Sequence, residues 1–363
     1  AATTPQLTRD LLGRSATPGS EVTLEGGFEG WPAPTIEWFH GTTKLTQTGP
    51  VLTLPAVASE DAGTYRAVAT NSAGQTASRE ATVVVGSTDT AALRLANVST
   101  RAGILSGDKV LIPGFVVGGT GTKEVIIRGV GPALADFVSN AAADTRIDLF
   151  MAPGANPIAS NDDWDAALIG DGFDLVGAFD FAPASKDAAL RLQLTPGSYS
   201  IHVNGVGGAT GIGLAEIYDV EPNSPARIVN LSTRGQVDGG DDLIVGGFVV
   251  HGSAPKRVLI RGIGPSLAQF GVPDVLRDPK LTLIEAARGD RPARTLLSND
   301  DWWSEPATGA RIAEFADQVG AFPIPPGSKD AALLVWLEPG GYTALLEGVA
   351  GDTGVGIVEI YEE

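Results

Sequence analysis

Apolar and polar residues alternate along much of this chain, with the period of two that is typical of β-strands burying one face. Leucines occupy every second position of 190–194, the turn Pro196-Gly197 follows, and the alternation resumes over 199–203. Unbroken apolar runs at 125–127 and 258–260 are typical of strands at the centre of a sandwich. Frequent glycine and proline, 47 and 24 residues, indicate many tight turns. We therefore predict an all-β fold.

The same signatures occur twice, in the same order, in the last two thirds of the chain. Arg128-Gly129-Val130-Gly131-Pro132 returns as Arg261-Gly262-Ile263-Gly264-Pro265, Asn161-Asp162-Asp163-Trp164 as Asn299-Asp300-Asp301-Trp302, and Glu216-Ile217-Tyr218 as Glu359-Ile360-Tyr361. A period of about 140 residues is too long for a solenoid repeat and suits a whole domain. Each copy is predicted to be a jelly-roll or Greek-key β-sandwich with one short helix, beginning at Pro132 or Pro265.

Short polar or proline-containing segments separate the copies from each other and from the N-terminal part of the chain. These linkers lie at 86–90 and 221–225. We expect three β-sandwiches in tandem, formed by residues 1–86, 91–220 and 227–363.

The N-terminal segment carries a pattern of its own. Trp38 follows a proline-rich turn, and Tyr65 lies in Asp61-Ala62-Gly63-Thr64-Tyr65. This segment resembles an immunoglobulin domain of the intermediate (I) set, with Trp38 as the core tryptophan and Tyr65 as the tyrosine corner. Gly26 and Ala67 stand at the family's two disulfide positions, so the resemblance implies a sandwich without the bridge. Domains of this family are usually spacers or binding modules and are rarely catalytic.

The duplicated unit resembles two kinds of secreted module. Its second half, with an Asn-Asp-Asp turn and a later Pro-Gly-x-Tyr hairpin, is loosely similar to the pre-peptidase C-terminal sandwich found beside secreted bacterial hydrolases. The whole unit resembles repeats of large exported bacterial surface proteins, often placed behind immunoglobulin domains. The resemblance implies an exported bacterial protein, secreted or held at the cell surface. The start at Ala1, with no apolar leader, fits a mature exported chain or a fragment of a longer one.

Composition narrows the function classes. A formal charge of −18 and a pI near 4.5 would repel nucleic acid and anionic membranes. No apolar run reaches the length of a membrane span. The chain has no cysteine, which excludes disulfides, thiol catalysis and zinc–thiolate sites. None of the three histidines recurs in both copies, so a histidine-based triad is not expected.

The Asn-Asp-Asp motif is the candidate metal site of each copy. Consecutive oxygen-bearing side chains suit Ca²⁺, and they are Asn161, Asp162, Asp163, Asn299, Asp300 and Asp301. The alternative is a side-chain turn in which Asn161 and Asp162 bond their own backbone and Trp164 closes the sandwich edge. A glycosidase pair is disfavoured, because neighbouring residues of a strand point to opposite faces.

Other residues suggest surface contacts or structural bonds. Of the adjacent tryptophans Trp302 and Trp303, one must leave the core if they lie on a strand, so Trp303 is a candidate contact for sugar or protein. Arg128 and Arg261 either bind an anion or tie down a loop through backbone carbonyls or a carboxylate such as Asp187 or Asp330. The tripeptide 288–290 lies in an insertion that only the second copy has, and we treat its integrin-like sequence as chance.

These observations predict a non-enzymatic structural or adhesive protein, a subunit of an extracellular or cell-surface fibre or sheath. Its expected partner is itself, in a homopolymer formed through edge strands. Residues 1–17 either reach a neighbouring molecule or form the first strand of their own sandwich. The alternative function is a polysaccharide-binding accessory region of a larger secreted hydrolase.

Overall fold

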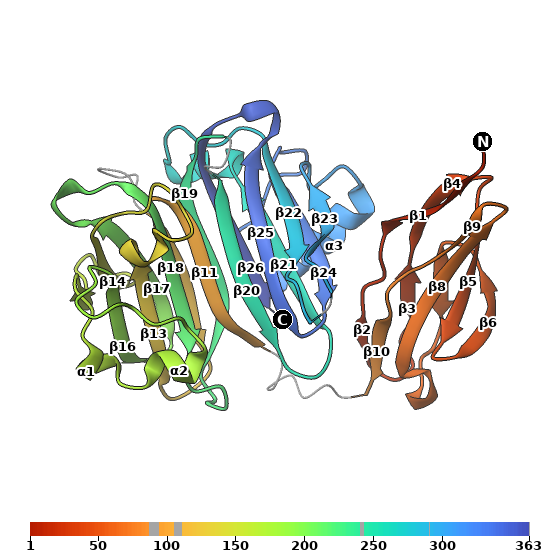
Figure 1. Cartoon of the computed structure of the whole chain (residues 1–363), viewed down its shortest axis with the longest axis horizontal. Helices are drawn as coiled ribbons and strands as arrows, with labels where there is room; N and C mark the ends of the chain where they lie inside the picture. The colour runs from red at the N-terminus through yellow and green to blue at the C-terminus, as the bar shows by residue number, and fades with distance from the viewer. Residues whose placement is uncertain (87–93, 105–110, 240–242, 290, 363) are drawn as a thin grey trace. The chain divides into compact units, whose positions relative to one another are not determined.

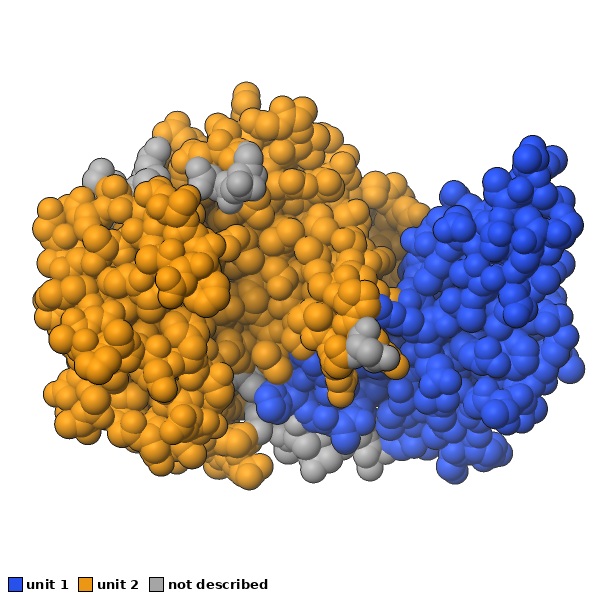
Figure 2. Space-filling model, in the orientation of Figure 1, with its two compact units in different colours: residues 1–93, 250–257, 336–340 blue, residues 94–249, 258–335, 341–363 orange. Residues whose placement is uncertain are grey.

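The computed structural model describes the chain except residues 87–93, 105–110, 240–242, 290 and 363 (Figure 1). It is an all-β protein built of tandem sandwiches, as predicted. The chain divides into two compact units, shown in Figure 2. The first comprises 1–93 with 250–257 and 336–340, and the second comprises 94–249, 258–335 and 341–363.

The N-terminal part of the first unit is a sandwich of short strands. One group pairs β1 (Thr3–Arg9) with β4 (Gly27–Trp31) and β3 (Val22–Glu25) with β7 (Val51–Leu54). The other sheet has the order β2 (Arg14–Ala16), β10 (Ala81–Val85), β8 (Gly63–Asn71), β5 (Thr35–His40) and β6 (Thr43–Thr48), with β9 (Gly74–Ala77) on β8. A 3₁₀ turn at Ser59–Asp61 precedes β8. Strand β1 therefore pairs within its own sandwich, which is the second of the two predictions for the N-terminal segment.

The core of this sandwich confirms the key residues of the sequence pattern. Trp38 is fully buried between the sheets. The Tyr65 hydroxyl donates to the Asp61 carbonyl at 2.8 Å, which is the tyrosine corner. A Cβ placed on Gly26 would lie 3.7 Å from that of Ala67, the spacing found in disulfides. Small residues and the nearby Phe28 fill the space that the bridge occupies in other members of the fold.

The second unit contains the first copy and most of the second, and the strands of the two copies form two sheets of eight. The first sheet has the order β16 (Ala188–Leu194), β13 (Lys123–Val130), β18 (Gly211–Asp219), β11 (Arg94–Ile104), β20 (Ile244–His251), β25 (Gly340–Gly348), β22 (Pro279–Glu285), β23 (Arg294–Asn299). The second has the order β15 (Ala159–Asn161), β14 (Thr145–Met151), β17 (Gly197–Gly205), β12 (Ile112–Gly118), β19 (Arg227–Val237), β26 (Gly354–Glu362), β21 (Lys256–Ile263), β24 (Ala331–Leu337).

Each sheet contains four strands from each copy, so continuous sheets connect the two copies in addition to the linker. Strand β11 pairs with β20, and β12 pairs with β19. Because β11 corresponds to β19 and β12 to β20, the contact has the reciprocity of a twofold, isologous interface. The predicted limits 91–220 and 227–363 mark the two copies in sequence, while both sheets run across that boundary.

Equivalent residues meet at this joint. The hydroxyls of Thr100 and Thr233, which occupy the same position in the two copies, lie 2.7 Å apart and are buried. A side chain on Gly114 would collide with the Ser232 hydroxyl, as one on Gly247 would collide with that of Ser99. The joint therefore requires small residues at the same place in both copies.

Helical segments are few and short. Pro132 and Pro265 begin the 3₁₀ turns Pro132–Leu134 and Pro265–Phe270, which confirms the predicted helical turns. The first copy also has α1 (Ala166–Ile169) and α2 (Gly172–Val176), and the second has α3 (Pro306–Gln318), three helices beyond the predicted one per copy. Further 3₁₀ turns lie at Val206–Gly208 and Val349–Gly351. Ile169 and Phe173 pack against β13, and Ile312 and Phe315 pack against β21.

The two ends of the second unit lie together. The backbone N–H of Leu95, on its first strand, donates to a carboxylate oxygen of Glu362 at 2.9 Å, at the end of its last strand. Both side chains are buried.

Candidate functional site

Each copy contains a fully buried arginine. Arg128, on β13, is fully buried, with its Nε 3.2 Å from a carboxylate oxygen of Glu216. It donates through Nη1 to the Phe179 carbonyl at 2.8 Å. Its guanidinium lies 4.1–4.5 Å from the ring centres of Phe173, Phe179 and Phe181. Burial raises the pKa of Glu216, and the charge of Arg128 opposes that rise.

The second copy repeats the contacts of the arginine with a carboxylate and a backbone carbonyl, while the rings beside it are those of Phe322 and Tyr361. Arg261 donates through Nε to Glu359 at 2.8 Å and through Nη1 to the Phe322 carbonyl at 2.6 Å. Tyr361 donates to the same Glu359 carboxylate at 3.0 Å, and burial raises the tyrosine pKa. Both arginines therefore tie down a loop, as the second of the two predictions states. Their carboxylate partners are Glu216 and Glu359.

Asp187 and Asp330 were the carboxylates expected beside the arginines, but they hold the neighbouring turns. Asp187 accepts from the Gly131 amide at 2.7 Å. Asp330 accepts from the Gly264 amide at 2.8 Å and from the backbone and hydroxyl of Ser266. Both aspartates are fully buried. These groups fix the strand-to-turn geometry and are closed to solvent.

The Asn-Asp-Asp motifs make the same bonds in both copies. Asn161 accepts from the Ala189 amide at 2.9 Å and donates to the Asp163 carbonyl at 2.8 Å. Asn299 accepts from Ala332 at 2.9 Å and donates to the Asp301 carbonyl at 3.1 Å. The asparagine thus bonds backbone two residues ahead, as in a side-chain turn.

The motif's third residue pairs with a lysine in each copy. Lys186 Nζ lies 2.8 Å from Asp163, and Lys329 Nζ lies 3.0 Å from Asp301. Asp162 and Asp300 are exposed. Across the described residues, no three His, Cys, Asp or Glu side chains gather as metal ligands. A calcium site at these turns, which would also draw on the asparagine oxygens, stays a prediction.

Trp303 lies in a turn before α3, not on a strand. Its ring packs edge-on against that of the buried Trp302, with ring centres 4.9 Å apart, and it lies against Gly309 of α3. Trp303 is half-buried, and its role as a surface contact stays a prediction. Strand alternation, on which that prediction rests, does not apply in this turn.

A tryptophan of the immunoglobulin sandwich is far more exposed. Trp31 is 68% exposed at the end of β4. Its amide donates to the Thr3 hydroxyl at 2.9 Å, and Asn71 donates to the carbonyls of Thr3 and Pro32. These bonds fix the backbone beneath the ring. The motif Trp31-Pro32-Ala33-Pro34 was visible in the sequence, but its exposure follows only from the fold.

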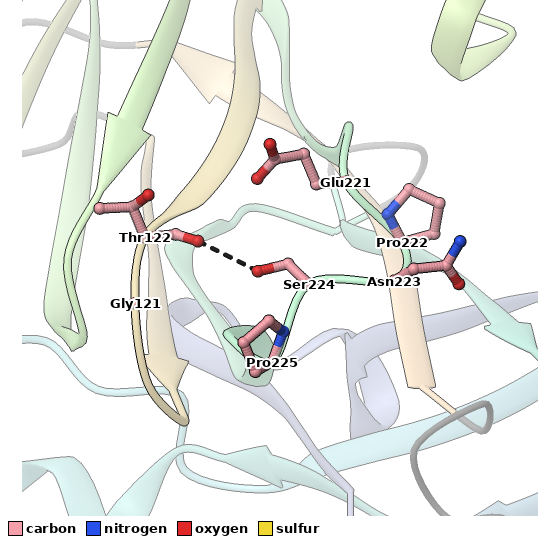
Figure 3. Close-up of a pocket in the computed structure, with 7 residues that line it drawn as sticks. All are labelled: Gly121, Thr122, Glu221, Pro222, Asn223, Ser224 and Pro225. Carbon is pink, nitrogen blue, oxygen red and sulfur yellow. Dashed lines mark hydrogen bonds between the residues drawn. The ribbon is translucent and has the colours of Figure 1, made fainter.

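A pocket of about 410 Å³ lies at the segment that connects the copies (Figure 3). It is lined by Gly121, Thr122 and residues 221–225. The Ser224 hydroxyl donates to the Thr122 carbonyl at 3.1 Å, the bond dashed in Figure 3. Buried Lys123 donates to the Glu221 carbonyl at 2.7 Å and to Asp219 at 2.8 Å. The Ser224 hydroxyl and the Lys123 ammonium therefore hold the connecting segment to the start of β13.

Comparison with known proteins identifies the N-terminal sandwich. The model of the immunoglobulin I-set domain matches residues 5–85. These residues form an I-set immunoglobulin domain. Domains of this architecture are common in cell-surface proteins. Within the described residues, no helix has the length and apolar character needed to cross a membrane.

Two curated proteins are similar to part of this chain. Rat coiled-coil domain-containing protein 141 is 36% identical over 96 residues, 24% of this chain and 6% of that protein. The bovine advanced glycosylation end product-specific receptor is 33% identical over 127 residues, 34% of this chain and 29% of the receptor. The chain thus spans less than a third of either relative.

Solved structures match the same fold over about a quarter of the chain. The titin M3 domain is 30% identical, covering 23% of this chain and 96% of that domain, with a TM-score of 0.21. Tandem immunoglobulin repeats of Dlar are 27% identical, covering 23% of this chain and 49% of theirs, with a TM-score of 0.23. The resemblance of the duplicated unit to bacterial surface repeats and to the pre-peptidase sandwich stays a prediction.

Proposed function

We propose that this protein is a non-catalytic structural protein, exported by a bacterium, whose molecules associate into an extracellular fibre or sheath. The observation that supports the proposal is the joint between the two copies. There the chain pairs edge strands of one module with those of another, β11 with β20 and β12 with β19. This pairing of two copies within one chain supports strand pairing between modules of different chains.

The outer ends of the two sheets offer the same kind of edge. Strands β16 and β23 end the first sheet, and β15 and β24 end the second. If β16 meets β23 of the next molecule while β15 meets β24, both sheets continue from molecule to molecule. Such a head-to-tail contact is heterologous, and it produces an open filament where the rotation from one molecule to the next does not close a ring.

Negative-stain electron microscopy and sedimentation velocity of the purified full chain test this function. We expect concentration-dependent polymers, and regular filaments in the micrographs. A parallel series with a chelator tests the calcium prediction, since loss of filaments there would tie assembly to the Asn-Asp-Asp turns. A chain that stays monomeric at every concentration, with and without Ca²⁺, would refute self-association.

The second candidate function is polysaccharide binding as an accessory region of a secreted hydrolase. Exposed Trp31 supports it, because an open indole face suits stacking against a sugar ring. Affinity electrophoresis in soluble polysaccharides tests it, with Trp31→Ala and Trp303→Ala compared with the wild type. Unchanged migration of the wild type in every polysaccharide would count against this candidate.

A further inference from the structure

The two copies differ on the surface that covers the outer face of their β13 or β21 strand. Ile169 in the first copy and Ile312 in the second are buried at the same position. The residue before this isoleucine is Leu168 in the first copy and Arg311 in the second. At another position the first copy has Leu175 and the second has Gln318.

The first copy's leucines are not needed by the fold. Leu168 is 72% exposed and Leu175 is 59% exposed, and the second copy builds the same layer with polar residues there. Phe179, which lies three residues beyond the end of α2, is 41% exposed. The corresponding Phe322 of the second copy is covered by the Phe270 ring, with ring centres 5.0 Å apart. We call Leu168, Leu175 and Phe179 the leucine face.

The leucine face lies in an acidic segment. Residues 165–180 contain no Lys or Arg, and their acidic residues are all exposed: Asp165, Asp171, Asp174 and Asp180. Arg191 of β16 pairs with Asp171 at 3.1 Å, which leaves an excess of negative charge. A partner that suits this face has small apolar residues flanked by arginine or lysine.

The second copy carries such a segment at the opposite end of the first sheet. The loop between β22 and β23, residues 286–293, contains Arg288 and Arg291 with a single acid, Asp290, and its remaining side chains are alanine and proline. Arg288 and Arg291 exchange backbone hydrogen bonds of 2.9 and 3.0 Å, and both residues are exposed. The matching loop of the first copy, 152–158, has no charged residue. We call 286–293 the arginine hairpin.

Topology places the two surfaces beside the strands at opposite ends of one sheet. Strand β16 ends the first sheet, and its Arg191 donates to the Ile169 carbonyl of α1 at 2.8 Å. Strand β23, next to the arginine hairpin, ends the same sheet at the other side, as Figure 1 shows. A contact between β23 of one molecule and β16 of another would therefore involve the strands that adjoin the arginine hairpin and the α1–α2 segment.

We propose that the leucine face receives the arginine hairpin of a second copy of this chain. This inference rests on the proposed self-association and specifies its contact. The surfaces that differ between the two copies are then the two halves of one head-to-tail interface. Contact between two leucine faces is disfavoured, because it would bring two acidic segments together.

Two double variants of the full chain test the contact. The face variant, Leu168→Arg with Leu175→Gln, carries the residues that the second copy tolerates. The hairpin variant is Arg288→Glu with Arg291→Glu. The control, Arg9→Glu with Lys44→Glu, makes the same charge change at exposed ion pairs of the immunoglobulin domain, which contribute little to stability. Circular dichroism checks that each variant is folded.

Sedimentation velocity of each variant and of an equimolar mixture gives the decisive result. We expect each variant alone to associate at least about tenfold more weakly than the wild type, and the control to assemble normally. Mixing should produce a one-to-one dimer that grows no further, because one intact face meets one intact hairpin. Wild-type assembly should weaken with added salt. If the wild type assembles and either variant does so equally well, this contact is wrong and the proposed function survives. A wild-type chain that does not assemble under any condition would refute both the contact and the proposed function.

Discussion

The paired hydroxyls at the joint can be tested by substitution, because replacing one of them should lower the free energy of unfolding more than replacing both. Thr100 and Thr233 lie 2.7 Å apart, with 1% and 3% of each residue exposed. Thr100→Val leaves the Thr233 hydroxyl buried without its partner, which costs about 1–3 kcal/mol. The double replacement removes both polar groups and keeps the branched shape at each site. We expect it to lie within about 1 kcal/mol of the wild type.

Differential scanning calorimetry of the four proteins measures this coupling. In a unit of this size a loss of about 2 kcal/mol lowers the transition temperature by about 4–8 °C. Each single variant should show such a shift in the transition of the second unit, and the double variant should recover most of it. The transition of the immunoglobulin domain is an internal control and should not move. A double variant whose loss equals the sum of the single losses would show that the two hydroxyls act independently and are not coupled at the joint.

Three further outcomes are expected. Asp352 accepts hydrogen bonds from the Arg277 side chain and from two backbone amides. Burial raises the pKa of Asp352, but these hydrogen bonds have the larger combined effect and hold the pKa below 3.8. The stabilisation from the Asp352 carboxylate is therefore present above pH 3.8 and is lost as the pH falls through the lowered pKa of the folded state. Asp352→Asn should reduce the transition temperature at neutral pH, and the transition temperatures of variant and wild type should converge in acid. Asp330→Ala leaves buried donors of Gly264 and Ser266 unpaired and should cost about 3–5 kcal/mol in urea denaturation; a loss below about 1 kcal/mol would contradict that account. Any polysaccharide binding should fall more with Trp31→Ala than with Trp303→Ala in affinity electrophoresis, and the reverse order would restore Trp303 as the contact.

Local patterns in the sequence were sufficient to predict the strands and the immunoglobulin core. Trp38 and Tyr65 occupy the expected places because their environment is set by residues close to them in a small sandwich. The helical turns after Gly131 and Gly264 follow from proline chemistry at one position. Such features depend on short-range geometry, which is determined by residues close together in the sequence.

The contacts between distant segments were not predictable in this way. Strands β11 and β19 have the same pattern, so the sequence does not show that each pairs with the other copy. Arg128 selects Glu216 from several acids in the first copy because β18 lies beside β13. Trp303 was assigned by strand alternation, but its chain segment is a turn held by α3. In each case the deciding quantity is the sheet order, a property of the whole unit.

The bond between Leu95 and Glu362 has a mechanical consequence. The first strand of the duplicated unit begins beside the end of its last strand, so tension applied between these two points acts locally there and does not pass through the length of the sheets. In the filament proposed above, load would instead travel from strand to neighbouring strand, at right angles to the covalent path. Chain connectivity and polymer strength would then be separate properties, which could be altered independently by changing the residues at this contact or those at the outer edges.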